Sequence, residues 1–346
     1  KKWLIFIMNK YFRKKRIYSV TTMTPHRISF AGGGTDYPEF YKKYGGSVIN
    51  STINKYLFVT VKAHGEIFSE KYRLMYSKTE LCNKISEIKN NIARECLKLV
   101  PVTTPITIST TSDLHPESGT GSSSCFAVGL LNALHTFRGE RVSPGQLAHE
   151  ACKIEIEKLK KTSGKQDQYA AAFGGINKFI FDKNGEIQIV PIKISSDNIS
   201  DLFFNLKMLW TGQKRDSSKI ARSYKLSGSN LDNIMKFKKM VLTFQKEIEK
   251  NKLNYKNIGL LIKESWTAKK TLSNSISPRI INNFSKKLNK LDVQGHRLLG
   301  AGGGGFFLCL LDSNKLKKVR KNFSKSKLIE IDYEPHGSRV VSLIYN

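Results

Sequence analysis

The stretch His115-Pro-Glu-Ser-Gly-Thr-Gly-Ser-Ser-Ser124 leads directly into the apolar run Cys125-Phe-Ala-Val-Gly-Leu-Leu-Asn-Ala-Leu134. This order predicts a glycine loop that opens a helix. Gly119 and Gly121 allow backbone dihedrals that other residues avoid, and the three serines can cap the helix by bonding its unpaired first-turn N–H groups. Free amides at the positive end of a helix attract anions. The alternative is an ordinary serine-capped helix after a flexible turn.

The preferred ligand of this loop is a nucleoside triphosphate, with a serine hydroxyl free to reach Mg²⁺. The loop is not a Walker A motif, because that motif places a lysine after its last glycine and this chain has Ser122 there. The residues expected to hold the nucleotide are Ser118, Gly119, Gly121, Ser122, Ser123 and Ser124.

A second glycine stretch suggests a site for a hydroxyl-rich ligand. The predicted strand Arg27-Ile-Ser-Phe30 leads into Ala31-Gly-Gly-Gly-Thr-Asp36, a turn in which backbone can approach a ligand while a carboxylate points at it. A plain glycine turn, with Asp36 bonding its own backbone, is the alternative. The stretch Gly164-Lys-Gln-Asp-Gln168 places Asp167 just before a helix of small residues.

Carboxylates on the intervening helix are candidates for a metal ligand and a proton acceptor. Ser143 and Pro144 mark the start of a helix over residues 143–159, as expected for an N-cap and a first helical position. Glu155, Glu157 and Asp167 follow, and each could equally be a surface charge. The seven histidines show no HExxH spacing, so a zinc or iron site held by the protein alone is not expected.

The composition is that of a soluble globular protein, with 40% hydrophobic and 25% charged residues. The 58 basic and 28 acidic residues give a formal charge of +30. The lysines are spread along the chain, which predicts a solvated basic surface that attracts phosphorylated ligands rather than a nucleic-acid interface. Five cysteines without a CxxC pair indicate free thiols in a reducing cytoplasm. No apolar run is long enough to span a bilayer.

The length of 346 residues predicts two domains, and the alternation of predicted strands and helices predicts an α+β fold. Residues 1–22 are interpreted as a basic N-terminal extension, with an amphipathic membrane arm as the alternative. Residues 23–200 form a first domain, with strands at 46–61 and 106–109. Residues 201–346 form a second domain. Its predicted parts are a strand at 203–211, helices over 231–288, a five-glycine turn and buried strand at 298–311, and a closing strand at 339–345.

Taken together and in chain order, the glycine stretches at 27–36, 119–134 and 299–306 resemble the three motifs of the GHMP kinase superfamily. Within it they are most similar to the D-glycero-D-manno-heptose 7-phosphate kinases, and the similarity spans residues 24–310. The resemblance implies two domains, an N-terminal one like domain 2 of ribosomal protein S5 and a C-terminal ferredoxin-like one. One departure concerns Glu117, an anion in the loop that should hold phosphates. Either its side chain points away, or the affinity for the nucleotide is modest.

The resemblance also implies roles. Asp167 stands at the position of the catalytic aspartate and Arg27 at that of the basic residue beside it. Ser123 and Glu155 are the implied ligands of Mg²⁺, with Glu157 as the fallback. The implied acceptor site consists of Gly32, Gly33, Gly34, Thr35, Asp36, Lys165, Arg215, Gly303 and Gly304.

The implied enzyme is a phosphotransferase that uses ATP and Mg²⁺ to phosphorylate the C1 hydroxyl of a heptose 7-phosphate, acting as a monomer or homodimer in the cytoplasm. Lys165 and Arg215 are the cations expected to hold the phosphate of the sugar. Two alternatives remain open at this point. One is a kinase of an unphosphorylated sugar such as fucose or galactose, and the other is a catalytically silent protein that binds sugar or nucleic acid.

Overall fold

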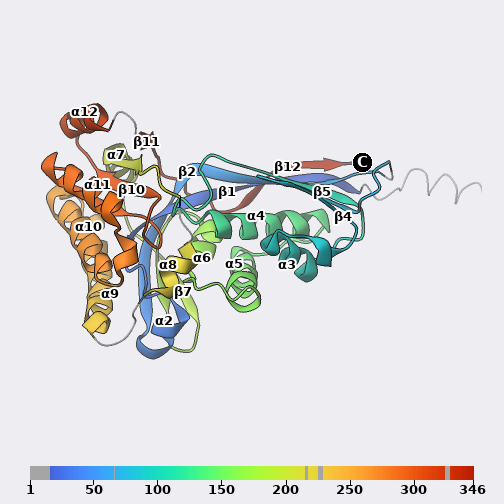
Figure 1. Cartoon of the computed structure of the whole chain (residues 1–346), viewed down its shortest axis with the longest axis horizontal. Coiled ribbons are helices and arrows are strands. Elements are labelled where there is room, and N and C mark those ends of the chain that lie inside the picture. Colours follow the sequence, from blue (N-terminus) through green and yellow to red (C-terminus); the bar gives the residue numbers. More distant parts are fainter. Residues whose placement is uncertain (1–15, 66, 215–216, 225–228, 324–327) are drawn as a thin grey trace, which may run out of the picture.

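The computed structural model describes residues 16–65, 67–214, 217–224, 229–323 and 328–346. Figure 1 shows two bodies joined along the strands β1 and β2, which run through the middle of the molecule. One body is a long sheet with helices on one face, and the other is a short sheet with its own helices. The predicted extension at 1–22 is described only from residue 16, and its residues 17–22 are already part of the first strand.

An eight-stranded sheet of the described residues forms the first body, in the order β12-β1-β2-β5-β3-β4, with β6 paired to β2 and β7 paired to β6. Its strands are β1 (Ile17–Ala31), β2 (Gly46–Ala63), β3 (Tyr72–Met75), β4 (Thr79–Cys82), β5 (Ile106–Ser112), β6 (Ile176–Phe181), β7 (Ile187–Pro191) and β12 (Arg339–Tyr345). The strands at 46–61 and 106–109 that the β-branched residues predict are thereby confirmed.

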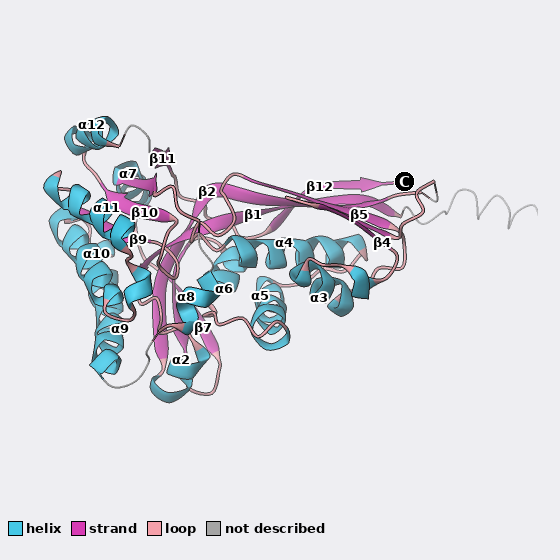
Figure 2. Ribbon diagram, in the orientation of Figure 1, coloured by secondary structure: helices cyan, strands magenta, loops and turns pink. Residues whose placement is uncertain are grey.

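Helices cover one face of this sheet, as Figure 2 shows for α3, α4, α5 and α6. The helices are α2 (Pro38–Tyr44), α3 (Asn91–Leu99), α4 (Ser122–Phe137), α5 (Pro144–Cys152) and α6 (Gln166–Phe173), with a 3₁₀ turn at Ile85–Glu87. Helix α4 is almost wholly buried, because it packs on β1 and β2 and is covered in turn by the other helices. That position explains why its sequence is apolar on all sides.

The second body has a four-stranded antiparallel sheet in the order β11-β8-β10-β9. Its strands are β8 (Leu206–Trp210), β9 (Gly295–Leu298), β10 (Phe306–Leu310) and β11 (Leu328–Glu330). Its helices are α7 (Ser196–Asn205), α8 (Ser217–Arg222), α9 (Ser229–Ile248), α10 (Tyr255–Lys270), α11 (Arg279–Lys290) and α12 (Ser313–Asn322), with a 3₁₀ turn at Asn274–Ile276. In chain order the strands give the β-α-β-β-α-β arrangement of a ferredoxin-like domain, which the resemblance implied.

The two bodies share an apolar core. Phe30 at the end of β1 stacks on Phe244 of α9 with ring centroids 5.1 Å apart, and α9 packs against β1 and β2. Both aromatic side chains are buried, as are Ile28 and Leu299 of the same cluster. The loops that leave β1 are therefore held firmly against the second body.

Three local predictions are wrong. Phe203 belongs to α7 rather than to a strand, because an N-capping Ser195 starts a helix that runs to Asn205, and the strand begins only at Leu206. The strand at 339–345 pairs with β1 in the large sheet instead of closing the second domain. The serines of the glycine loop do not cap α4, since Gly121 is its N-cap residue and Ser122 is already helical.

His135 near the end of α4 lies between two carboxylates. Its Nδ1 is 2.6 Å from Glu140 Oε2 and its Nε2 is 2.9 Å from Glu150 Oε2. The hydrogen bond with Glu150 raises the pKa of His135 above its ordinary value of 6.5, against the opposing effect of burial. Because the pKa is raised in the folded state, the stabilisation is fully present below pH 6.5 and is lost as the pH rises through the folded pKa.

We expect His135→Gln to lower the free energy of unfolding more at pH 5.5 than at pH 9. The difference between the two pH values should be on the order of 1 kcal/mol, because both carboxylates are partly solvated. Urea denaturation of both proteins at each pH measures it. His336→Gln, which replaces an exposed histidine, serves as the control. Equal losses at both pH values would contradict the assigned ion pair.

Candidate active site

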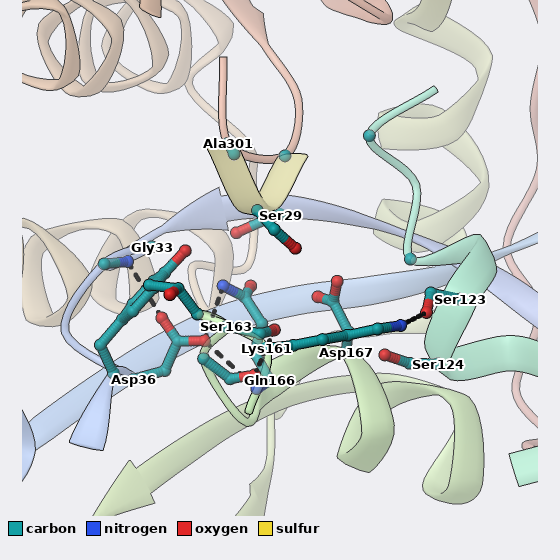
Figure 3. Close-up of a pocket in the computed structure, with 18 of the residues that line it drawn as sticks. Ser29, Gly33, Asp36, Ser123, Ser124, Lys161, Ser163, Gln166, Asp167 and Ala301 are labelled. Atoms are coloured by element: carbon teal, nitrogen blue, oxygen red, sulfur yellow. Dashed lines mark hydrogen bonds between the residues drawn. The ribbon is translucent and has the colours of Figure 1, made fainter. Parts of the chain in front are cut away.

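A cavity of about 170 Å³ lies where the glycine loops of both bodies meet. Figure 3 shows Gly33 and Asp36 at one end of it and Ser123 and Ser124 at the other, with Asp167 between them. The predicted site residues that line it are Arg27, Gly33, Gly34, Asp36, Gly119, Gly121, Ser122, Ser123, Ser124, Glu155 and Asp167. Stretches separated by more than a hundred residues in the sequence are thus brought to one place.

The loop before α4 has two glycines in backbone conformations that other residues rarely adopt. Gly119 and Gly121 have φ of 88° and 82°, in the left-handed region that favours glycine. Gly121 lets the chain turn directly into α4, so the first-turn amides of this helix face the cavity end that Ser123 lines. An anion at that end would meet both the amides and the positive end of the helix.

The five-glycine turn of the second body supports this loop from behind. The Phe306 N–H donates to the Ser118 carbonyl at 3.1 Å, and a Cβ on Gly305 would lie 2.2 Å from the same oxygen. A side chain at Gly305 would therefore push the two loops apart. Gly300 and Ala301 of the turn also line the cavity.

Glu155 is the centre of a buried network beneath the first turn of α4. Its carboxylate accepts hydrogen bonds from Ser123 Oγ, from Ser124 Oγ at 2.7 Å, from Gln168 Nε2 at 2.7 Å and from Lys161 Nζ at 3.1 Å. Burial alone would raise the pKa of Glu155, but the charge of Lys161 and the hydroxyl groups outweigh it and lower the pKa. The carboxylate is therefore ionised at neutral pH.

A π-helical turn explains why Glu155, and not Glu157, reaches the serines. The chain continues from α5 into a π-helix at Lys153–Lys158, in which each turn holds more residues than an α-helical one. Glu155 is consequently only 2% exposed, whereas Glu157 is exposed and does not line the cavity. Of the two glutamates that the sequence left open, the structure brings Glu155 to Ser123.

Arg27 and Asp167 form a two-point ion pair in the cavity wall. Arg27 Nε donates to Asp167 Oδ1 and Nη2 to Oδ2, both at 2.7 Å, while Nη1 donates to the Gly119 carbonyl at 2.6 Å. The arginine side chain is 5% exposed and the aspartate side chain 21% exposed. Each carboxylate oxygen keeps a further lone pair, so Asp167 can still accept a hydrogen bond from a hydroxyl group in the cavity.

The loop after β1 positions Asp36. Its Oδ1 accepts from the Gly34 N–H at 3.0 Å, and its Oδ2 accepts from the backbone N–H and the Nε2 of Gln166 at 3.2 and 3.1 Å. Burial raises the pKa of Asp36, although the bonds with the Gly34 and Gln166 amides lower it in part. A Cβ on Gly164 would lie 1.9 Å from Oδ2, so this glycine lets the two loops meet.

Several predicted residues do not line the cavity. Thr35 is buried and donates to the carbonyls of Gly32 and Ser47, so it holds the loop in shape. Lys165 Nζ lies over the ring of Tyr41, 5.3 Å from its centroid. Gly32, Ser118, Gly303 and Gly304 likewise belong to the supporting structure of the loops. Arg215 lies outside the described residues.

Other cavity residues were not identified from the sequence. Lys161 has no distinguishing signal among the neighbouring lysines of its loop. Arg297 has one, because His296 and Arg297 stand just before the five-glycine turn. Lys269 and Tyr224 donate to the carbonyls of Gly300 and Ala301 and so hold that turn at the cavity.

Glu117 does line the cavity and is exposed, with φ of 62°. The sequence left two possibilities, a side chain that points away from the phosphates or a modest affinity for the nucleotide. Its backbone lies in the region that glycine prefers, and its carboxylate adds a negative charge to the wall of the cavity.

Residues 83–175 match the family model of the GHMP kinases N terminal domain. The chain is 28% identical over 324 residues to D-glycero-alpha-D-manno-heptose 7-phosphate kinase of Campylobacter jejuni, covering 88% of this chain and 94% of that one. It is 26% identical over 337 residues to the galactokinase of Pyrococcus furiosus, covering 87% and 91% of the two chains. These two relatives extend the match well beyond the N-terminal domain.

Solved structures share the fold. The crystal structure of a D-glycero-D-manno-heptose 1-phosphate kinase from Bacteroides thetaiotaomicron superposes with a TM-score of 0.76 at 19% identity, over 94% of this chain and all of that one. A putative sugar kinase from Campylobacter jejuni gives 0.73 at 24% identity, over 94% and 99%. Residues 83–175 therefore carry a GHMP kinase N-terminal domain, and the similarity to sugar kinases over most of the chain identifies the protein as a phosphotransferase with an alcohol group as acceptor.

Proposed function

We propose that this protein is a sugar kinase that transfers the γ-phosphoryl group of ATP to the C1 hydroxyl of D-glycero-D-manno-heptose 7-phosphate. The product is the 1,7-bisphosphate, an intermediate for nucleotide-activated heptose, and the reaction takes place in the cytoplasm. One observation carries the proposal: the pair of Arg27 and Asp167 lies between a loop suited to phosphates and a loop suited to hydroxyl groups. The match to the Campylobacter jejuni kinase supports the choice of sugar.

The triphosphate of ATP is held at the Ser123 end of the cavity. Backbone amides of the loop and the first turn of α4 donate to its oxygens, and Arg27, which is fixed by Gly119 and Asp167, adds positive charge. Phosphoryl transfer requires little covalent chemistry from the protein, so positioning and charge neutralisation account for most of the rate.

Ser123 and Glu155 fit a hard divalent cation such as Mg²⁺. Their oxygens converge on one point, and Lys161 Nζ already contacts both, at 2.7 Å from Ser123 Oγ and 3.1 Å from Glu155 Oε1. The contact with the ammonium group of Lys161 indicates that a positive charge is favourable at this position, and Mg²⁺ prefers oxygen ligands. The described residues contain no cluster of three or more His, Cys, Asp or Glu side chains that could hold a metal, so the nucleotide would supply the remaining ligands. When bound, the metal neutralises part of the triphosphate charge.

Asp167 orients the attacking hydroxyl and accepts its proton. The anomeric hydroxyl of a sugar is more acidic than an ordinary alcohol, so a carboxylate is a sufficient base. Arg27 donates to both oxygens of this carboxylate and so fixes its orientation. Asp36 and Gln166 at the other end of the cavity are placed to bond the remaining sugar hydroxyls.

We expect the acceptor that already carries a phosphate to be strongly preferred. The value of kcat/KM for heptose 7-phosphate should exceed that for the free heptose by at least about tenfold, because a charge-assisted bond to phosphate contributes that much. An assay that couples ADP release to a colour change, run over free and phosphorylated heptoses and hexoses, measures the preference.

The same assay tests the alternative, a kinase of an unphosphorylated sugar, which the galactokinase match favours. Equal values for heptose and heptose 7-phosphate, or a better value for galactose or fucose, would overturn the heptose 7-phosphate assignment.

No helix of the described residues is long and apolar enough to cross a membrane. All five cysteines are buried and unpaired, as expected for the reducing compartment in which we place the reaction.

A further inference from the structure

Arg297 is a second buried arginine in the cavity wall, and the proposed reaction gives it no role so far. It lies on β9 and is 2% exposed. Its Nη1 donates to the carbonyl of Phe30 at 2.5 Å and to Ser265 Oγ at 2.7 Å, and both acceptors are neutral. Phe30 leads into the loop of Gly33 and Asp36, so Arg297 belongs to that end of the cavity.

The charge of Arg297 has no counter-charge within the described part of the chain. No carboxylate there forms an ion pair with it, and its Nε is buried without a hydrogen-bond partner. Burial, together with the nearby charge of Arg27, lowers the pKa of Arg297 to about 10, so the group is still a cation at neutral pH. A buried charge is unfavourable unless it is paired, so an anionic ligand is the expected partner.

Space for such a ligand exists beside the guanidinium group, because residue 33 is a glycine. A Cβ on Gly33 would lie 4.0 Å from Arg297 Nη2, 3.8 Å from Ser29 Oγ and 3.7 Å from Gln166 Nε2. The φ of Gly33 is not in the left-handed region, so the backbone does not require glycine here. The absent side chain instead keeps the space between these polar groups open.

A second unpartnered group faces the same space. Ser29 Oγ is buried and has no hydrogen-bond partner among the described residues. Nearby Asp36 is turned to Gly34 and Gln166, whose amides donate to both of its carboxylate oxygens. A hydroxyl and a guanidinium group that border one opening suit a phosphate, which has several oxygens to accept their bonds.

The position of this opening in the cavity indicates whether it would bind a phosphate of ATP or the phosphate of the acceptor. The triphosphate lies at the Ser123 end of the cavity, the attacking hydroxyl at Asp167, and Gly33 is at the opposite end (Figure 3). Building on the function proposed above, we propose that Arg297, with Ser29, binds the phosphate that the acceptor already carries. Arg297 is thereby the residue that makes the enzyme prefer a phosphorylated sugar, a role first predicted for Lys165 and Arg215.

The test compares two acceptors in matched variants. We expect Arg297→Gln to lower the ratio of kcat/KM for heptose 7-phosphate to that for free heptose by about 10- to 100-fold, mainly through KM for the phosphorylated sugar. Ser29→Ala, which leaves the buried arginine in place, should lower the same ratio by a smaller factor. Arg279→Gln removes an exposed cation outside the cavity and should keep the wild-type ratio.

Inorganic phosphate provides a second measurement that does not depend on the identity of the sugar. It should inhibit the wild type competitively with the acceptor, and the inhibition constant should rise at least about tenfold in Arg297→Gln. Thermal melting of each variant shows whether the protein is folded under the assay conditions.

The outcomes separate the two proposals. If the wild type prefers an unphosphorylated sugar, the proposed function fails, and the phosphate inhibition constants still decide the role of Arg297. If the wild type prefers heptose 7-phosphate but Arg297→Gln slows both acceptors equally, or phosphate inhibits both proteins equally, Arg297 serves the nucleotide or the fold. Either of these results overturns its role in binding the phosphate of the acceptor.

Discussion

Replacing Asp167 by Asn should lower kcat by about 10²–10⁴, with the affinity for ATP little changed. The amide keeps the shape of the side chain but cannot accept a proton, and it cannot match both charge-assisted bonds from Arg27. Steady-state kinetics with saturating ATP and acceptor measure the loss, and a fluorescent nucleotide titration measures ATP affinity.

The control for this prediction is Asp197→Asn, which changes an exposed aspartate on α7. It should keep the wild-type kcat. Arg27→Met should also lower the rate, because it removes both the partner of Asp167 and a charge near the phosphates. A near-normal kcat in Asp167→Asn at neutral pH would refute the base assignment, and direct attack steered by Arg27 and the metal would then be the better mechanism.

Replacing the proposed Mg²⁺ ligands is the second change for which we expect a large effect on activity. We expect Ser123→Ala and Glu155→Gln to weaken the apparent affinity for Mg²⁺ by at least about tenfold, because each removes or neutralises an oxygen ligand. Raising the Mg²⁺ concentration should partly restore turnover in both variants. The measurement is the rate as a function of Mg²⁺ at fixed ATP.

Gln is chosen at residue 155 because Ala would leave the buried donors of Ser124, Gln168 and Lys161 without an acceptor. The matched control is Glu157→Gln, two residues away and exposed, which should leave the Mg²⁺ dependence unchanged. If Glu157→Gln shifts the dependence and Glu155→Gln does not, the metal assignment is wrong.

The local sequence predicted the elements that local rules control. Ser143 and Pro144 start α5 as predicted, because a capping hydroxyl and a fixed φ act within one turn. The glycines at 119 and 121 indicated a turn with positive φ, and the structure has one. The position of Phe203 could not be predicted in this way, since an apolar stretch at a helix end looks like a strand until the cap at Ser195 is considered.

Interactions between distant segments could not be predicted from spacing. The sequence left Glu155 and Glu157 open, and only the π-helical turn, packed beneath α4, determines which one is buried. The β-forming residues at 339–345 are compatible with either sheet. This segment pairs with β1 because β1 otherwise has an edge of unpaired backbone groups. Lys165, a cation within the motif, is instead placed over Tyr41.

The sequence by itself therefore predicted the GHMP kinase fold and placed Arg27 beside Asp167, because its glycine stretches resemble the motifs of that superfamily, and the structure contains this ion pair. The tertiary structure alone showed that Lys161 contacts Ser123 and Glu155, and that Arg297 is buried without a counter-charge beside Gly33. The burial of a side chain and the pairing of its charge depend on which surfaces pack together. Here the two domains enclose one cavity, so both properties are set only in the folded chain.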